Sequence, residues 1–238
     1  MDKKTFAALC DLYEKKLRLL RNPACLKCDA TVRYPLSAWH VGNDFQKSPR
    51  RLLFIGKPHR GKPGKIRRSG VLDPRDTVDR LKDYSWPYWS YTREIATKLF
   101  GDRDRGWDAI ALTNLVKCTR VSGGSSVDRT TEQMVRSCLI DVGALSAEVE
   151  MLKPTHLIFY TGKLFPVLLS EMEIEGSSNW HDVKRTSIPC GTKRMLWWDR
   201  KIRTSWGTLR ALVTGHPERM KKEAFTRAIA RWALLPAN

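Results

Sequence analysis

The sequence has few acidic residues for its basic content. It carries 25 Asp and Glu against 43 Lys and Arg, which gives a formal net charge of +18. A charge of this size bears on partners and association rather than on fold. It favours a polyanion as the partner, because each phosphate that the protein neutralises releases condensed counterions.

Long apolar stretches are also missing. No run of 18 apolar residues occurs, so the sequence predicts no membrane-spanning helix. The first residues, Met1 to Lys4, lead into an amphipathic segment instead of the apolar core of a signal peptide. Internal repeats and low-complexity tracts are absent as well. We therefore expect an intracellular, cytoplasmic monomer without a membrane partner, folded as a single domain over residues 1–238.

Four short apolar runs predict buried strands, at residues 51–56, 108–114, 156–160 and 209–214. Helices are predicted at residues 4–20, 91–100, 130–152 and 218–233, with a further helix after residue 162. Residues 176–206 are polar and Trp-rich and predict short hairpin strands. This alternation predicts an α/β fold, a three-layer α/β/α sandwich around a four-stranded, mainly parallel sheet. Sites in such sheets lie beyond the carboxyl ends of the strands, where Gly56, Asn114, Gly162 and His216 fall.

Four of the six cysteines have a spacing that suits a metal centre. They are Cys25, Cys28, Cys118 and Cys138. Inside cells, grouped thiols bind metal more often than they pair. One short pair with two dispersed cysteines favours a [4Fe–4S] cluster over zinc, which more often uses two short pairs. Residues 1–50 would then form an N-terminal helix and a cluster-binding segment. The plainer alternative is four unrelated buried thiols, and Cys10 and Cys190 are expected to be packing residues.

Six segments match the motifs of one known family in sequence order. They are Cys25–Cys28 with Arg33, Leu53–Gly56, Thr113–Cys118, Cys138, Lys153–Gly162 and Thr214–Pro217. On these segments the chain resembles the uracil-DNA glycosylase superfamily, most closely its branches that carry a [4Fe–4S] cluster. Each motif is weak alone, and their common order carries the resemblance. It implies the fold above, DNA as partner, and hydrolysis of an N-glycosidic bond.

The first catalytic motif departs from the family. Relatives follow the first strand with a Gly-Glu-x-Pro-Gly type of loop, whereas this chain has Gly-Lys-Pro-His-Arg-Gly at residues 56–61. The carboxylate that positions water is therefore missing, and Asp73 and Asp76 are the nearest carboxylates in sequence. Asp73 precedes a proline and can equally be a turn residue. The aromatic that stacks on the flipped base is not evident, and residues 70–73 are where we would expect it.

Five residues are candidates for the chemistry. Asn114 would read the Watson–Crick edge of a flipped base, although an asparagine there can also cap a turn. His216 would donate to the base oxygen that gains negative charge as the bond breaks. Lys57 and His59 would place water, with His59 as a base when neutral. Lys57 could instead attack the sugar as an amine nucleophile. Asp73 completes the set as a candidate acid.

A further group of residues is predicted to contact DNA. Gly56 and Lys117 would line the base site, and Arg219 or Met220 would fill the gap left in the duplex, although a plain helix start is the alternative. The basic loop after the first strand would hold phosphates. Its cations are Lys57, Arg60, Lys62, Lys65, Arg67 and Arg68.

These features predict a monofunctional DNA glycosylase that flips a base and leaves an abasic site. Because the usual carboxylate and aromatic are missing, we expect a modified pyrimidine instead of plain uracil, such as hydroxymethylated or glucosylated cytosine of phage DNA. The enzyme would then act in anti-phage defence. Three alternatives stay open: a uracil-excising repair enzyme, a non-catalytic cluster-bearing DNA-binding protein, and a nuclease. The sequence shows no metal-binding carboxylate set to support the last.

Overall fold

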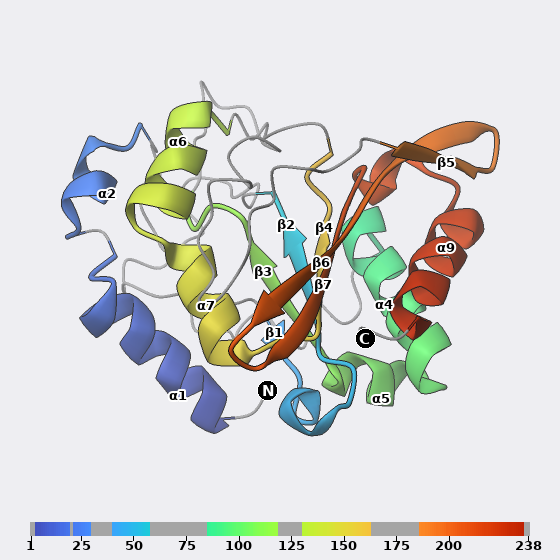
Figure 1. The fold of residues 1–238 in the computed structure, drawn as a ribbon, viewed down its shortest axis with the longest axis horizontal. Coiled ribbons are helices and arrows are strands. Elements are labelled where there is room, and N and C mark those ends of the chain that lie inside the picture. Colours follow the sequence, from blue (N-terminus) through green and yellow to red (C-terminus); the bar gives the residue numbers. More distant parts are fainter. Residues whose placement is uncertain are drawn as a thin grey trace.

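A seven-stranded sheet, in the order β1-β3-β2-β4-β7-β6-β5, runs through the middle of this computed structural model (Figure 1). The structure describes residues 3–19, 21–29, 40–57, 85–118, 130–162 and 186–235. The strands are β1 (His40–Val41), β2 (Leu52–Gly56), β3 (Ile110–Asn114), β4 (His156–Phe159), β5 (Thr186–Cys190), β6 (Lys193–Thr204) and β7 (Gly207–Thr214).

The centre of the sheet is parallel and its edges are antiparallel. Strand β2 pairs in parallel with β3 and β4, and β4 pairs in parallel with β7. These are the four strands that the apolar runs predict, so the α/β prediction is confirmed. The prediction of a four-stranded, mainly parallel sheet was wrong, because β1 adds to β3 and the β7–β6–β5 strands continue the other edge, all antiparallel. The polar, Trp-rich segment at residues 176–206 was expected to form short hairpin strands. Its sequence does not indicate that β5 and β6 extend the main sheet.

Helices cover both faces of the sheet. They are α1 (Lys3–Asp11), α2 (Pro23–Lys27), α4 (Pro87–Phe100), α5 (Arg103–Asp108), α6 (Glu132–Arg136), α7 (Ala144–Leu152) and α9 (Lys222–Leu234). Single turns of other helix types lie at η1 (Leu12–Lys16), η2 (Phe45–Lys47), η3 (Ser137–Asp141) and η4 (Pro217–Arg219). In Figure 1, α1, α6 and α7 lie on one side of the sheet, and α4, α5 and α9 lie on the other. Across the described ranges, no helix combines the length and apolar character needed to cross a bilayer.

The predicted helix over 130–152 is interrupted. It consists of α6, one π-type turn and α7, and Gly143 before α7 adopts a left-handed conformation with φ +66°. A left-handed residue cannot continue a right-handed helix, and glycine adopts that conformation without strain. The break therefore separates α7 from the turn that carries Cys138.

Two hydrophobic cores lie on the two faces of the sheet. Alternate residues of β2 point to opposite faces, so Leu53 and Ile55 join one core while Leu52 and Phe54 join the other. All five β2 residues are buried, as expected for a parallel strand with helices on both sides. The first core packs against α1 and α7, and we call it the α7 side. The second, the α4 side, packs against α4 and α9.

Candidate functional site

The carboxyl ends of the parallel strands bring the predicted end residues to one edge of the sheet. Gly56 and Asn114 are register partners in the last pair of β2 and β3. The N–H of Leu115 donates to the Gly56 carbonyl at 2.9 Å, and the N–H of Gly162 donates to the Thr214 carbonyl at 2.9 Å. His216 follows two residues after Thr214, at the end of β7. The carboxyl edge of the parallel strands, where the site was predicted, therefore carries all four expected residues.

Gly56 allows a close approach at this edge. A Cβ atom at this position would lie 2.8 Å from Cε2 of Tyr88 and 2.9 Å from Oδ1 of Asn114. Both distances are shorter than carbon atoms tolerate, so a side chain here would displace Tyr88 or the Asn114 amide. Glycine at position 56 is therefore explained by the Tyr88 ring and the Asn114 amide, which pack against it.

Tyr88 is a site residue that sequence reasoning missed. It lies in the first turn of α4, and its ring is nearly parallel to that of His216, with ring centroids 6.4 Å apart and an interplanar angle of 21°. Its edge-to-face partners are Tyr160, at 5.6 Å, and Trp89, at 4.6 Å. Burial raises the pKa of the Tyr88 phenol well above its ordinary value, which keeps it neutral. Residues 70–73, where a stacking aromatic would be expected, lie outside the described residues, whereas Tyr88 supplies an aromatic ring from α4.

His216 is partly exposed, with 29% of its side chain accessible. It caps the short helix η4, where its Nδ1 accepts a hydrogen bond from the N–H of Glu218 at 3.4 Å. The Glu218 carboxylate lies 3.7 Å from the same nitrogen. In the neutral ring, an accepting Nδ1 leaves Nε2 as the donor. Nε2 is therefore the nitrogen that carries the proton in the neutral His216 ring.

Asn114 is buried, with 4% of the residue exposed. Its backbone carbonyl accepts a hydrogen bond from Nζ of Lys117 at 2.6 Å. Lys117 itself is 1% exposed and pairs with Glu148 at 2.5 Å. The predicted role of Lys117 was contact with the base or DNA, but the structure turns its ammonium group inward, onto Glu148 and the backbone that carries Asn114.

The structure describes three of the other predicted DNA-contact residues, Arg219, Met220 and Lys57. Arg219 is exposed, whereas Met220 is half-buried against the α4 side, where its carbonyl accepts from the hydroxyl of Tyr91 at 2.9 Å. Lys57 is half-buried and directly follows Gly56. The rest of the basic loop and the candidate water-positioning residues lie outside the described residues. They are His59, Arg60, Lys62, Lys65, Arg67, Arg68 and Asp73.

The four predicted metal ligands pack against one core, on the α7 side. Cys138 is buried, and its Sγ accepts the Lys117 N–H at 3.4 Å. Burial raises the pKa of Cys138 to about 12, Lys117 acts to lower it, and nearby Cys25 acts to raise it further. The N–H of Cys28 donates to the Cys25 carbonyl at 3.3 Å.

A metal site needs donor side chains that converge on one position. In the part of the chain that the structure describes, no three His, Cys, Asp or Glu side chains form a group that could hold a metal ion. This counts against a preformed zinc site, which needs all four sulfurs within bonding distance of one ion. A [4Fe–4S] cluster spreads its four thiolates over separate iron atoms and so needs them farther apart. The structure itself shows four thiols that pack against one core.

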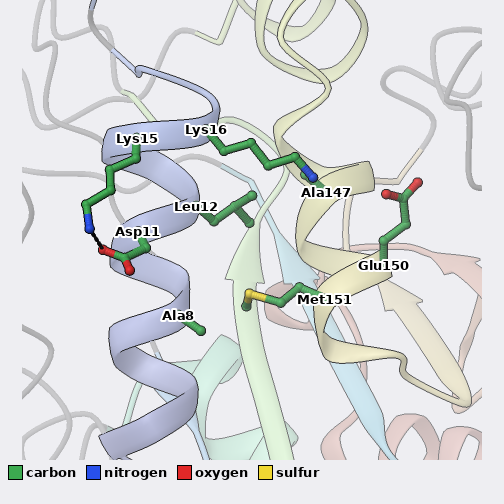
Figure 2. Close-up of a pocket in the computed structure, with 8 residues that line it drawn as sticks. All are labelled: Ala8, Asp11, Leu12, Lys15, Lys16, Ala147, Glu150 and Met151. Atoms are coloured by element: carbon green, nitrogen blue, oxygen red, sulfur yellow. Dashed lines mark ion pairs between the residues drawn. The ribbon is translucent and has the colours of Figure 1, made fainter.

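One groove lies away from this edge. It has a volume of about 670 Å³ and runs between α1 and α7 (Figure 2). Its lining residues are Ala8, Asp11, Leu12, Lys15, Lys16, Ala147, Glu150 and Met151. Of the predicted catalytic, DNA-contact and metal-binding residues that the structure describes, none lines the groove. The groove therefore does not contribute to the candidate site.

The comparisons with known proteins give no family for the chain. No protein-family model matches the sequence, and none of the curated proteins matches it. Residues at the carboxyl edge of the sheet are therefore the basis for inferring a function.

Proposed function

We propose that this protein is a DNA glycosylase that flips a modified pyrimidine out of DNA and hydrolyses its N-glycosidic bond. One observation carries the proposal: Gly56, Asn114 and His216 gather around the ring of Tyr88 at the carboxyl edge of the parallel strands. This set combines an amide, an imidazole donor and an aromatic ring. A base can be bound by such a set through edge recognition and stacking.

Each residue would have a distinct part in the reaction. The Asn114 amide would donate to and accept from the Watson–Crick edge of the base. His216 would donate through Nε2 to a base oxygen as negative charge develops there, an interaction that strengthens in the transition state. Tyr88, neutral because its pKa is raised by burial, would contact the ring without adding charge. The excess of 18 positive charges would attract the DNA backbone.

The substrate class follows from what the first motif lacks. The segment 56–61 offers no carboxylate, so Lys57 and His59 are the groups available there to place water. A basic pocket without the usual acid suits a larger, polar pyrimidine, such as hydroxymethylated or glucosylated cytosine. An enzyme with this preference would act against phage DNA. Excision of plain uracil is the less favoured alternative.

Base release from a panel of DNAs tests this proposal. Protein purified without air is incubated with DNA containing uracil, hypoxanthine, hydroxymethylcytosine or glucosylated cytosine, and released bases are identified by mass spectrometry. We expect a modified cytosine, and a drop of about 100- to 1,000-fold in rate for Asn114→Ala and for His216→Ala. Asn43→Ala is the matched control, since this exposed asparagine lies beside Asp108 at the other end of β3. Release of uracil alone would overturn the substrate class, and release of no base would overturn the activity.

We further infer that Cys25, Cys28, Cys118 and Cys138 hold a [4Fe–4S] cluster. When bound, the cluster would supply a structural tie between the N-terminal segment and the α7 side. Cys138→Ala should abolish bound iron and sulfide, while Cys190→Ala should retain both, because Cys190 is a buried cysteine on the α4 side. Zinc in place of iron in the purified protein would contradict the cluster.

A further inference from the structure

Lys117 has an unusual position for a lysine, since it is almost wholly buried next to a site residue. Its ammonium group has three oxygen partners: Oε1 of Glu148 at 2.5 Å, the Asn114 carbonyl at 2.6 Å and Oγ1 of Thr113 at 2.9 Å. An ammonium group has three protons to donate. The three partners therefore account for all of its hydrogen-bonding capacity.

Glu148 is buried as completely as its partner. It lies on α7 with 0% exposure, and it accepts hydrogen bonds from the hydroxyl of Thr113 at 2.7 Å and from the hydroxyl of Tyr13. A buried carboxylate is tolerated only when its oxygens are paired in this way. The network joins η1, through Tyr13, to α7 and to the last residues of β3.

The network ends at the residue that would read the base. Lys117 fixes the carbonyl of Asn114, and the next N–H, that of Leu115, is fixed by the Gly56 carbonyl at 2.9 Å. The peptide that carries the Asn114 side chain is thus held on both sides. Oδ1 of Asn114 lies over Gly56, only 2.9 Å from where a Cβ would stand, so the amide occupies space that glycine leaves open at position 56.

We propose that Lys117 and Glu148 are positioning residues, which hold the Asn114 amide where the flipped base is read. The inference rests on the proposed function for its chemistry, but the positioning itself is a property of this fold. Lys117 acts through Asn114 and does not touch the base. Misplacing a reading group by about 1 Å costs roughly 100-fold in rate.

A pair of variants separates positioning from plain stability. Lys117→Met keeps the length of the side chain and leaves Glu148 charged, buried and without its cation. Lys117→Met with Glu148→Gln removes both charges and keeps an oxygen acceptor for Tyr13. We expect the single variant to lose stability and the double variant to regain most of it, because the uncompensated charge is gone.

Activity should not recover with stability. We expect kcat/KM for base release to stay about 10- to 100-fold below wild type in both variants. Discrimination between modified cytosine and uracil should weaken as well. Arg210→Met is the matched control, since this buried cation is bound to α9 and β6 and not to the site. A double variant with recovered stability and base release within about twofold of wild type would refute positioning.

Hydrogen exchange tests the positioning role of Lys117 independently of the proposed glycosylase activity. Hydrogen exchange of the peptide spanning residues 113–118 should speed up in the double variant at least about tenfold, and should be unchanged in Arg210→Met. If wild-type protein releases no base, the proposed function fails, and the exchange result still decides the positioning role. Unchanged exchange in the double variant would overturn the positioning role even if the enzyme is active.

Discussion

Two cations are buried at opposite ends of the same sheet. The side chain of Lys117 is 1% exposed and that of Arg210 is 4% exposed. Lys117 pairs with Glu148, which is fully buried, whereas Arg210 pairs with Asp199, whose side chain is 35% exposed, at 2.8 Å. Each cation also donates to the backbone, Lys117 to the Asn114 carbonyl and Arg210 to two carbonyls at the end of α9. The two cations therefore differ mainly in the segment of the chain that they hold.

Arg210 serves the end of a helix. It is the register partner of His156 at the amino end of β4. Its guanidinium donates to the carbonyls of Trp232 and Leu235, at 2.9 and 3.2 Å, and lies 4.7 Å from the centre of the Trp232 ring. These carbonyls lie at the end of α9, where the last carbonyls of a helix lack the usual N–H donors of a following turn. A buried cation thus completes the fold at one end of the sheet, and at the other end Lys117 braces the candidate site.

The largest effect in this comparison is expected from Arg210→Met. The variant removes the guanidinium that donates to two helix-end carbonyls and pairs with Asp199, so we expect the free energy of unfolding to fall by about 3 kcal/mol. Urea unfolding gives the value. Arg231→Met, an exposed cation on α9, is the control and should cost less than about 0.5 kcal/mol.

Base release measured on the folded fraction should be the same for Arg210→Met and wild type. Within the described ranges, the hydrogen-bond and ring partners of the Arg210 guanidinium lie on α9, its cap and β6, away from the carboxyl edge of the parallel strands. A loss of base release as large as that of Lys117→Met would remove the distinction between the two cations.

The second effect concerns pH at the amino end of the sheet. Burial, followed by the charges of Arg210 and Arg50, lowers the pKa of His156 to about 4 from its ordinary 6.5. Between these two values the unfolded chain binds a proton that the folded chain does not. Stability is therefore present above pH 6.5 and is lost as the pH falls towards 4, by roughly 2 kcal/mol at pH 5.

Urea unfolding at a series of pH values checks this dependence. His156→Phe keeps an aromatic ring against Trp232, whose ring centroid lies 5.3 Å away, and removes the titrating group. The slope of stability against pH between 4 and 6.5 should become shallower in this variant. An unchanged slope would assign the dependence to other groups.

The central part of the fold could be predicted from the sequence, because it depends on local patterns. Each parallel strand contains a short, mainly apolar run, and the residues that follow this run mark the carboxyl edge. Gly56, Asn114 and His216 were placed at one edge on this basis alone. The antiparallel edge strands were not predicted as part of the sheet, since β6 mixes charged and apolar residues and only three of its twelve residues are buried.

The rest of the site depends on contacts between distant segments. Tyr88 comes from the start of α4, and its local sequence signals only a helix with a proline in the first turn. Glu148 lies on α7, where the pattern gives no sign that a carboxylate points into the core. Its burial is possible only because Lys117 and Tyr13 reach it from elsewhere in the chain. Tyr88 and Glu148 are therefore identified from the packing of the folded chain and not from a sequence motif.

A smaller effect is expected from Tyr13→Phe, which probes the outer end of the Lys117 network. The variant removes one hydroxyl donor from a charged acceptor, and we expect about 1.5 kcal/mol of lost stability. Glu148 keeps its bonds to Lys117 and Thr113, so base release should stay within about twofold of wild type. Tyr91→Phe, which loses a hydrogen bond to the Met220 carbonyl on the α4 side, is the matched control for stability. A large loss of activity in Tyr13→Phe would extend the positioning role to the N-terminal segment.

The smallest effect concerns the break that precedes α7. Gly143 has φ +66°, and a Cβ there would meet no atom within 4 Å, so only the backbone conformation opposes a side chain. Gly143→Ala should cost about 1 kcal/mol, and Gly143→Asn less, because asparagine tolerates the left-handed region better. Thermal unfolding compares the two, and base release should be unchanged in both. If Gly143→Ala lowered base release while remaining folded, the placement of α7 would set the position of Glu148. The Lys117 network would then depend on the backbone of α7 as well as on its own hydrogen bonds.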